Sequence, residues 1–207
     1  MKVAIIGGTG KLGLGFVSRL QHTAHECAIG SRDRGKAQAA AASLPRPPAA
    51  FSNDDAAEWC ELAVLTIPYA AHRALIEPLA HNLRGKVVID ATVPLNPQDL
   101  YRRSSESGTS AAEETSALLA EVQVFAGFHT ISHRLLRQAD HSEDVLIAGP
   151  NQRKPDVMQF IRDLNLRPVD AGPIEASRLL ESMTALLISI NRQNKVKESG
   201  LRITGIL

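Results

Sequence analysis

The feature that most constrains this chain is a glycine-rich turn between an apolar run and a helical pattern. Residues 7–13 are Gly-Gly-Thr-Gly-Lys-Leu-Gly, with the apolar run at residues 3–6 before them and apolar residues at helical spacing after them. Glycines here allow a tight turn and let backbone N–H groups approach a pyrophosphate at the positive end of the helix. Because strand, glycines and helix follow in the required order, we predict that Gly7, Gly8 and Gly10 bind a dinucleotide.

Strand-like and helix-like segments alternate along the rest of the chain. Apolar runs typical of buried strands lie at residues 3–6, 26–29, 62–67, 86–91, 122–128 and 145–148. Helical patterns lie at residues 12–20, 33–44, 69–82 and 173–191, with a short helix around Trp59 capped by Ser52 or Asn53, and a loop at residues 102–116 that enters a helix near Ser110. This alternation predicts an α/β fold, a Rossmann-type doubly wound parallel sheet with a small C-terminal α/β elaboration. We assign residues 1–150 to the dinucleotide-binding domain and residues 151–207 to the small C-terminal region.

Charge and cysteine content exclude several classes of protein. Lys and Arg number 23 and Asp and Glu 22 among 207 residues, a formal net charge of +1. A chain so close to neutral lacks the broad positive field that favours nucleic acid or an anionic membrane. Two cysteines cannot build a disulfide framework, and no run of about 20 apolar residues is present to span a bilayer. We therefore expect a cytoplasmic protein that binds small molecules and neither nucleic acid nor membrane.

The residues after the second predicted strand favour one dinucleotide over the other. NAD-binding folds usually place a carboxylate here to hold the ribose 2′-hydroxyl, whereas in this chain Gly30 is followed by Ser31 and Arg32, with Lys36 one helical turn beyond. A hydroxyl, a guanidinium and an ammonium are groups that bind a 2′-phosphate. We therefore predict NADP as the nucleotide. Two alternatives stay open, because Asp33 could be a displaced ribose ligand and the segment could be an ordinary solvated start of a helix.

Six blocks of sequence, taken in order, resemble one enzyme family. The blocks are MKVAIIGGTGKLGLGF, IGSRDRGKA, LAVLTIP, VVIDATVP, GFHTI and LRPVDAGPIEASRLLESMTALLISI, in register from Met1 to about Ile190. Together they are similar to the NADPH-dependent oxidoreductases of coenzyme F420. The resemblance implies reversible hydride transfer between NADP(H) and the 5-deazaflavin of F420. It also implies a small C-terminal part that helps to form the deazaflavin pocket, and a homodimer.

The resemblance further implies which residues lie at the cofactors. Those that it places at NADP are Thr9, Gly10, Lys11 and Leu12 in the glycine turn, Ser31, Arg32 and Lys36 at the 2′-phosphate, and Thr66, Ile67 and Pro68 after a later strand. Gly127 stands where the family has a small residue near the nicotinamide. His129 either lines the cofactor cleft, as the family implies, or is a structural histidine with its hydrogen bonds satisfied. Because both reacting atoms belong to the nicotinamide and the deazaflavin, no side chain needs to be assigned as catalytic.

Other functions are compatible with the same residues. The nucleotide site could serve a reductase of a flavin, an imine or a ketone, or a sensor that binds NADP without turnover. His129 and His133, with a downstream histidine and acid, could bind a metal ion, but their spacing departs from the usual ligand motifs, so we predict no metal site. Ser177, Glu181 and Thr184 form a polar stripe on the last predicted helix, which either faces the cleft or lies in solvent.

Overall fold

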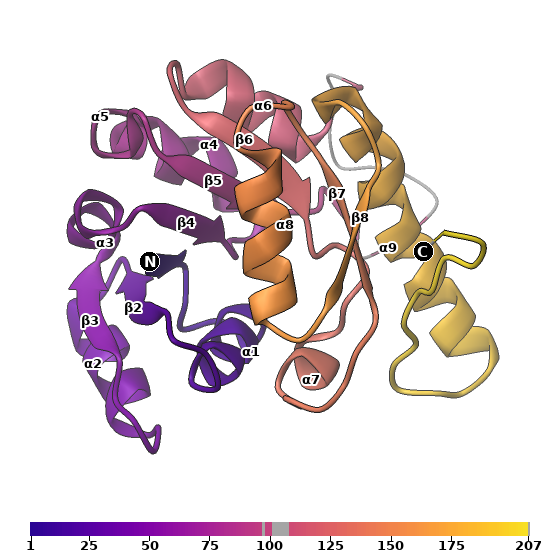
Figure 1. Cartoon of the computed structure of the whole chain (residues 1–207), viewed down its shortest axis with the longest axis horizontal. Coiled ribbons are helices and arrows are strands. Elements are labelled where there is room, and N and C mark those ends of the chain that lie inside the picture. The colour runs from indigo at the N-terminus through magenta and orange to yellow at the C-terminus, as the bar shows by residue number, and fades with distance from the viewer. Residues whose placement is uncertain (97, 101–107, 207) are drawn as a thin grey trace.

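A mixed β-sheet covered by helices on both faces is the framework of this computed structural model, which describes residues 1–96, 98–100 and 108–206. Within these residues eight strands form a sheet in the order β3-β2-β1-β4-β5-β6-β7-β8 (Figure 1). The strands are β1 (Lys2–Ile6), β2 (Glu26–Ser31), β3 (Ala49–Ser52), β4 (Leu62–Leu65), β5 (Val87–Asp90), β6 (Gln123–Gly127), β7 (Asp144–Ala148) and β8 (Arg167–Asp170).

Four of the described helices begin after a residue whose side chain satisfies an exposed backbone N–H group. The described helices are α1 (Lys11–Leu20), α2 (Arg34–Ala42), α3 (Asn53–Trp59), α4 (His72–Ile76), α5 (Ala80–Leu83), α6 (Ala111–Leu118), α7 (His133–Leu136), α8 (Lys154–Asp163) and α9 (Ser177–Gln193), with 3₁₀ turns η1 (Tyr69–Ala71), η2 (Glu77–Leu79) and η3 (Ile174–Ala176). The side chains of Asp33, Ser52, Ser110 and Ser132 accept hydrogen bonds from the first turns of α2, α3, α6 and α7. Such caps stabilise a helix start by about 1 kcal/mol each.

The central strands are buried on both faces, which explains their continuous apolar sequences. On β1, Val3 and Ile5 belong to a core cluster shared with α1, α2, α7 and α8, whereas Ala4 and Ile6 belong to a cluster on the other face with α3, α4 and α5. Successive residues of a strand point to opposite faces, so both sets must be apolar when helices cover both. The buried sheet holds the C-terminal ends of its parallel strands at one edge.

The predicted doubly wound α/β fold is confirmed, with one reversal of strand direction. The strands from β3 to β6 are parallel, but β7 runs antiparallel to β6 and β8 is parallel to β7. The predicted parallel sheet therefore extends from β3 to β6, and the last two strands run in the opposite direction. An apolar run such as residues 145–148 carries no information about the direction of the strand it forms.

The sequence pattern does not predict the two edge strands, β3 and β8. The first follows a proline-rich segment, and the second contains Pro168. Proline is tolerated on an edge strand because the backbone there pairs on one side, although in a sequence it argues against a strand. Both edges are short, with four residues each.

Proline also breaks the helix predicted at residues 69–82. The segment forms η1, α4, η2 and α5 in succession, with Pro78 near the start of η2. Proline lacks the N–H of a regular helix and clashes with the preceding turn. The last helix likewise begins later than predicted, because Pro173 precedes η3 and α9 starts at Ser177.

The predicted helix start near Ser110 is confirmed by α6, while residues 101–107 of the expected loop lie outside the described residues.

The C-terminal part of the chain continues the same sheet. β8 pairs with β7, and Leu180 of α9 packs against Ala126 of β6 and Ala148 of β7. The chain then returns toward β7, where the backbone N–H of Asp144 donates to the carbonyl of Leu201 at 3.1 Å. Among the helices that the structure describes, none has both the length and the apolar character needed to cross a bilayer.

Candidate functional site

The glycine turn brings the start of α1 close to the sheet. Gly7 has a φ of +75°, which side-chain-bearing residues rarely adopt, and a Cβ there would lie 2.8 Å from Cγ2 of Ile67. A Cβ on Gly13 would lie 2.6 Å from the Cα of Gly8, so the helix can pack at this distance only with glycine. Gly10 precedes α1 and no side chain caps the helix there, which leaves its N-terminal N–H groups for an anion.

A cleft of about 550 Å³ opens beside this turn, and we call it the nucleotide cleft. Eleven of the fourteen predicted site residues line it: Gly7, Thr9, Gly10, Lys11, Leu12, Ser31, Arg32, Lys36, Thr66, Ile67 and Pro68. The other three do not: Gly8 lies beneath the turn, Gly127 is inside β6, and His129 lines a different cavity. The cleft lies at the C-terminal ends of β1, β2 and β4, where ligands of doubly wound folds bind.

Sequence reasoning missed four residues of the nucleotide cleft: Asn53, Ala71, Leu75 and Ala91. Asn53, which we considered only as a helix cap, is 6% exposed, and its Oδ1 accepts a hydrogen bond from the N–H of Gly7 at 3.4 Å. The helix cap itself is Ser52. A polar residue directly after a parallel strand would have indicated a residue at the ligand-binding edge of the sheet. Asn53 was missed because the sequence pattern does not predict β3.

The end of β2 presents two cations to the cleft, together with the cap residue Asp33. Arg32 and Lys36 are exposed, line the cleft, and have no carboxylate partner in the part of the chain that the structure describes. One oxygen of Asp33 caps α2, since its Oδ1 accepts from the N–H of Lys36 at 3.1 Å. Arg34 faces Asp55 at 3.8 Å. This arrangement suits a 2′-phosphate, while Asp33 also lines the cleft with its Oδ2 outside the cap contact.

A second cavity of about 460 Å³ adjoins the first, and we call it the second pocket. Its lining residues are Lys11, Leu12, Ala91, Val93, Leu95, the segment from Phe128 to Arg134, Thr184, Leu187, Ile188, Asn191, Lys197, Glu198 and Ser199. Lys11, Leu12 and Ala91 line both cavities, so the start of α1 and the turn after β5 form a junction between them. Ligands bound in the two cavities would meet at this junction.

His129 reaches the second pocket through an unusual backbone conformation. Phe128, the residue before it, has a φ of +66°, and Phe128 is held by the ring of Phe16 with centroids 4.7 Å apart. Such conformations of bulky residues are strained and concentrate at functional sites. The carbonyl of His129 accepts from Oγ1 of Thr184 at 2.8 Å, which ties the end of β6 to α9.

The His129 ring is a buried, neutral group beside the second pocket. Burial lowers its pKa to about 4, against the opposing charge of Asp90, so the imidazole is uncharged near pH 7. Both ring nitrogens are buried, and among the described residues the Thr92 backbone lies near enough to raise the pKa, but no hydrogen bond of normal geometry is formed. A buried polar group without a protein partner is costly unless a ligand or water completes it.

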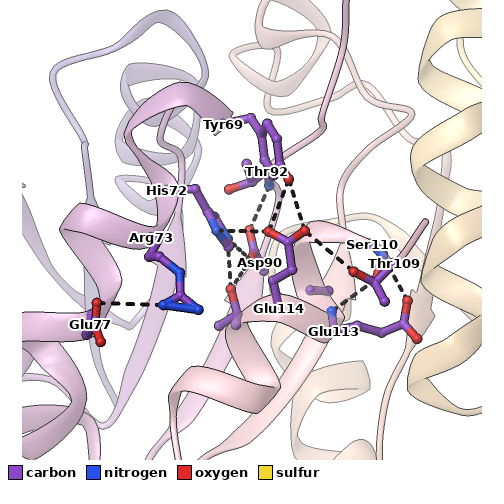
Figure 2. Close-up of polar contacts among 12 residues, drawn as sticks. Tyr69, His72, Arg73, Glu77, Asp90, Thr92, Thr109, Ser110, Glu113 and Glu114 are labelled. Atoms are coloured by element: carbon purple, nitrogen blue, oxygen red, sulfur yellow. Dashed lines mark hydrogen bonds and ion pairs between the residues drawn. The ribbon is translucent and has the colours of Figure 1, made fainter. Parts of the chain in front are cut away.

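Beneath the junction, a buried network fixes the end of β5 (Figure 2). Oδ2 of Asp90 accepts from Oγ1 of Thr115 at 2.6 Å and lies 3.1 Å from Nε2 of His72, while Oδ1 accepts from the N–H of Thr92 at 2.8 Å. Burial alone raises the pKa of Asp90, but these hydrogen bonds and the His72 charge outweigh it and lower the pKa below its usual value. Glu114 faces the other ring nitrogen of His72 at 3.8 Å.

The polar stripe of the last helix is not solvated at its start. Ser177 is fully buried and its hydroxyl lies 2.6 Å from that of Ser110, while Glu181 is 2% exposed and accepts from the N–H of Ala112. Thr184, the third residue of the stripe, lines the second pocket. The stripe therefore joins α9 to α6 and places Thr184 at a ligand cavity. Across the described residues, no three His, Cys, Asp or Glu side chains are grouped to hold a metal ion.

The doubly wound sheet, the glycine turn and the cations after β2 define a Rossmann-type dinucleotide-binding protein with an adjoining pocket for a reaction partner. A family model described as NADP oxidoreductase, coenzyme F420-dependent, matches residues 2–94. The F420-dependent NADP reductases of Methanothermobacter marburgensis and Methanothermobacter thermautotrophicus are 34% and 33% identical to this chain, over all of it and over 99% and 96% of their own lengths. The chain therefore belongs to the family of F420-dependent NADP oxidoreductases, as its sequence blocks predict.

A solved structure supports the fold independently. A crystal structure from Arthrobacter sp. FB24 superimposes with a TM-score of 0.84 at 24% identity, covering 99% of both chains. At this identity the comparison establishes the fold alone.

Proposed function

We propose that the protein transfers a hydride reversibly between NADP(H) in the nucleotide cleft and coenzyme F420 in the second pocket. The junction at Lys11, Leu12 and Ala91 carries this proposal, because these residues line both cavities. Hydride transfer needs two ring faces about 3–3.5 Å apart, which joined cavities permit. When bound, NADPH supplies the hydride that the deazaflavin accepts at C5.

The residues of the nucleotide cleft fit NADP in three parts. The uncapped start of α1, with Thr9, binds the pyrophosphate through backbone N–H groups. Arg32 and Lys36 bind the 2′-phosphate by charge-assisted hydrogen bonds. The segment of Thr66, Ile67 and Pro68 forms the wall beside the nicotinamide half, and Oγ1 of Thr66 is held by the carbonyl of Ile6 at 3.0 Å.

The second pocket fits a flat, mostly apolar ring system with a few polar edges. Leu12, Val93 and Ile131 supply apolar lining, and the neutral His129 ring supplies one donor and one acceptor. Removing water from this junction and holding the rings in register are the tasks left to the protein, because the reacting atoms belong to the ligands. We therefore assign His129 to orientation of the second ligand and name no catalytic residue.

The direct test mixes the protein with NADPH and oxidised F420 and follows the visible absorption of the deazaflavin. We expect bleaching that depends on enzyme concentration and reverses when NADP and reduced F420 are supplied. No bleaching beyond an enzyme-free control would refute the proposal. Parallel reactions with FMN, a cyclic imine and a ketone distinguish the rival reductases, and tight NADPH binding without turnover of any acceptor would favour a sensor.

We also propose that the chain forms a homodimer through α9. Leu179, Leu186 and Ile190 of this helix are 71%, 59% and 39% exposed, a large apolar surface for one helix. A Leu186→Glu variant would then sediment as a monomer, while Gln193→Glu, on the same helix, would not change the assembly. Unchanged sedimentation of Leu186→Glu would argue against this interface.

We also propose a cytoplasmic location and a division of the chain into two functional parts. A cytoplasmic location is supported by the free thiols of Cys27 and Cys60, since unpaired cysteines are typical of reducing compartments. Burial raises the pKa of these thiols to about 12 and about 11, which makes them inert. The sheet does not break at residue 150, because β8 pairs with β7. We propose the division into residues 1–150 and 151–207 because the later part contributes α9 and the C-terminal tail to the second pocket.

A further inference from the structure

The second pocket changes character from its buried part to its exposed part. Phe128 and Ile131 are 2% and 5% exposed and give the interior an apolar lining. Three exposed cations, Lys11, Arg134 and Lys197, line the same pocket. A cavity built this way suits a ligand with an apolar ring at one end and negative charge at the other.

Positive charge dominates this exposed part. The pKa of His133 is lowered by its burial and then by the charges of Arg134, Arg137 and Lys11, so these three cations all lie near the His133 ring. Glu198 is the one carboxylate among the described residues that line the pocket. It lies 3.9 Å from Arg134 and accepts from the hydroxyl of Ser132 at 3.0 Å, so it offsets a single charge.

The cations come from parts of the chain that only the fold brings together. Arg134 lies on α7, whereas Lys197 lies on the tail that follows α9. The tail is held in place by the hydrogen bond from Asp144 to Leu201 and by the contact of Glu198 with Ser132. Lys197 has no carboxylate partner within the described part of the chain, so its charge is available to a ligand.

We propose that Arg134 and Lys197 form an anion subsite that recognises the acidic side chain of the second substrate. The inference rests on the proposed function: coenzyme F420 joins its deazaflavin ring, through a ribityl phosphodiester, to a chain of glutamyl carboxylates. The ring occupies the apolar interior, and the phosphodiester and carboxylates lie against the exposed cations. The subsite selects F420 over a flavin or deazaflavin that lacks the acidic chain.

The test compares binding of F420 with binding of the deazaflavin riboside, which has the ring and ribityl group but neither phosphate nor glutamate. Dissociation constants are measured from deazaflavin fluorescence with NADP present, on Arg134→Gln, Lys197→Gln and the double variant. The matched control is Arg84→Gln, because Arg84 is 59% exposed, as Arg134 is 54% exposed, and pairs with Glu121 at 3.8 Å outside both cavities.

We expect each single variant to weaken F420 binding about twofold to fivefold, the range of exposed ion pairs, and the double variant about fourfold to 25-fold. Riboside binding, NADPH binding and the Arg84→Gln control should change less than twofold. The loss should shrink at about 0.5 M salt, because an ionic strength well above the physiological value screens exposed charges more strongly. F420 preparations with different numbers of glutamates separate the phosphodiester from the carboxylates as the contacted group.

Three results would overturn the subsite. They are unchanged F420 binding in the double variant, an equal loss for the riboside, and an equal loss for NADPH, which would assign the cations to the nucleotide. The outcomes also separate this inference from the proposed function. If F420 binding depends on these charges but no hydride transfer occurs, the subsite is supported and the proposed reductase activity is refuted. If hydride transfer occurs but F420 binding does not depend on these charges, the activity is supported and the subsite is refuted.

Discussion

Replacing Asp90 with asparagine removes the charge at the centre of the network beneath the junction. Asparagine can keep the contact from Oδ1 to the N–H of Thr92, but its amide group would face His72 and Thr115 in place of Oδ2. Asp90 is fully buried and His72 is 2% exposed, so no water can take over these contacts without a rearrangement. Figure 2 shows the His72 ring pointing toward this carboxylate.

The cost can be worked out from these contacts. A hydrogen bond to a charged group contributes about 1.5–3 kcal/mol, so losing two gives about 3–6 kcal/mol. Removing one partner of a buried ion pair costs about 3–5 kcal/mol, and we adopt this narrower range for the loss in free energy of unfolding. For a chain of this length the Tm should fall by about 6–20 °C.

Thermal and urea unfolding, followed by circular dichroism, measure this loss. The matched control is Glu77→Gln, which makes the same carboxylate-to-amide change in an exposed pair, where Arg73 lies 4.0 Å away and both side chains are more than 60% exposed. That control should change stability by less than about 1 kcal/mol. If Asp90→Asn were no more destabilised than Glu77→Gln, the network would not depend on the Asp90 charge and our reasoning would be wrong.

The pH dependence has a defined sign. Because the pKa of Asp90 is lower in the folded protein, its ionised form stabilises the fold above the unfolded pKa of about 3.9. That contribution is lost as the pH falls through the lower folded value. The stability difference between the wild type and Asp90→Asn should therefore shrink only below about pH 4. A difference that shrank between pH 5 and 8 would point to another group.

Three substitutions test the nucleotide cleft. Arg32→Ala should raise the KM for NADPH about tenfold or more and leave that for NADH unchanged, because only NADPH carries the 2′-phosphate; equal effects on the two would remove Arg32 from this role. Gly10→Val should abolish NADPH binding in calorimetry while the chain still folds, since a Cβ at Gly10 meets no atom closer than 3.4 Å. Gly13→Ala should instead lower the free energy of unfolding by about 1–3 kcal/mol, because its Cβ would lie 2.6 Å from Gly8; an unchanged Tm would contradict the close packing of α1.

The sequence alone determines the features that depend on neighbouring residues. A strand, a glycine turn and a helix in immediate succession predict the nucleotide cleft, and the cations Arg32 and Lys36 lie on either side of the cap of α2. The central strands are predicted because burial on both faces leaves an unbroken apolar run. These signals are local, so no knowledge of the tertiary structure is needed to recognise them.

Only the tertiary structure decides features that join distant segments. The direction of β7 depends on how the chain crosses the sheet, and no side-chain pattern records it. His72, Asp90 and Thr115 meet across three elements, and Arg134 and Lys197 line one pocket although 63 positions (197 − 134 = 63) separate them. Each of these residues has an ordinary sequence context. Their roles arise because packing the helices on both faces of the sheet fixes which distant side chains lie within hydrogen-bond or ion-pair distance.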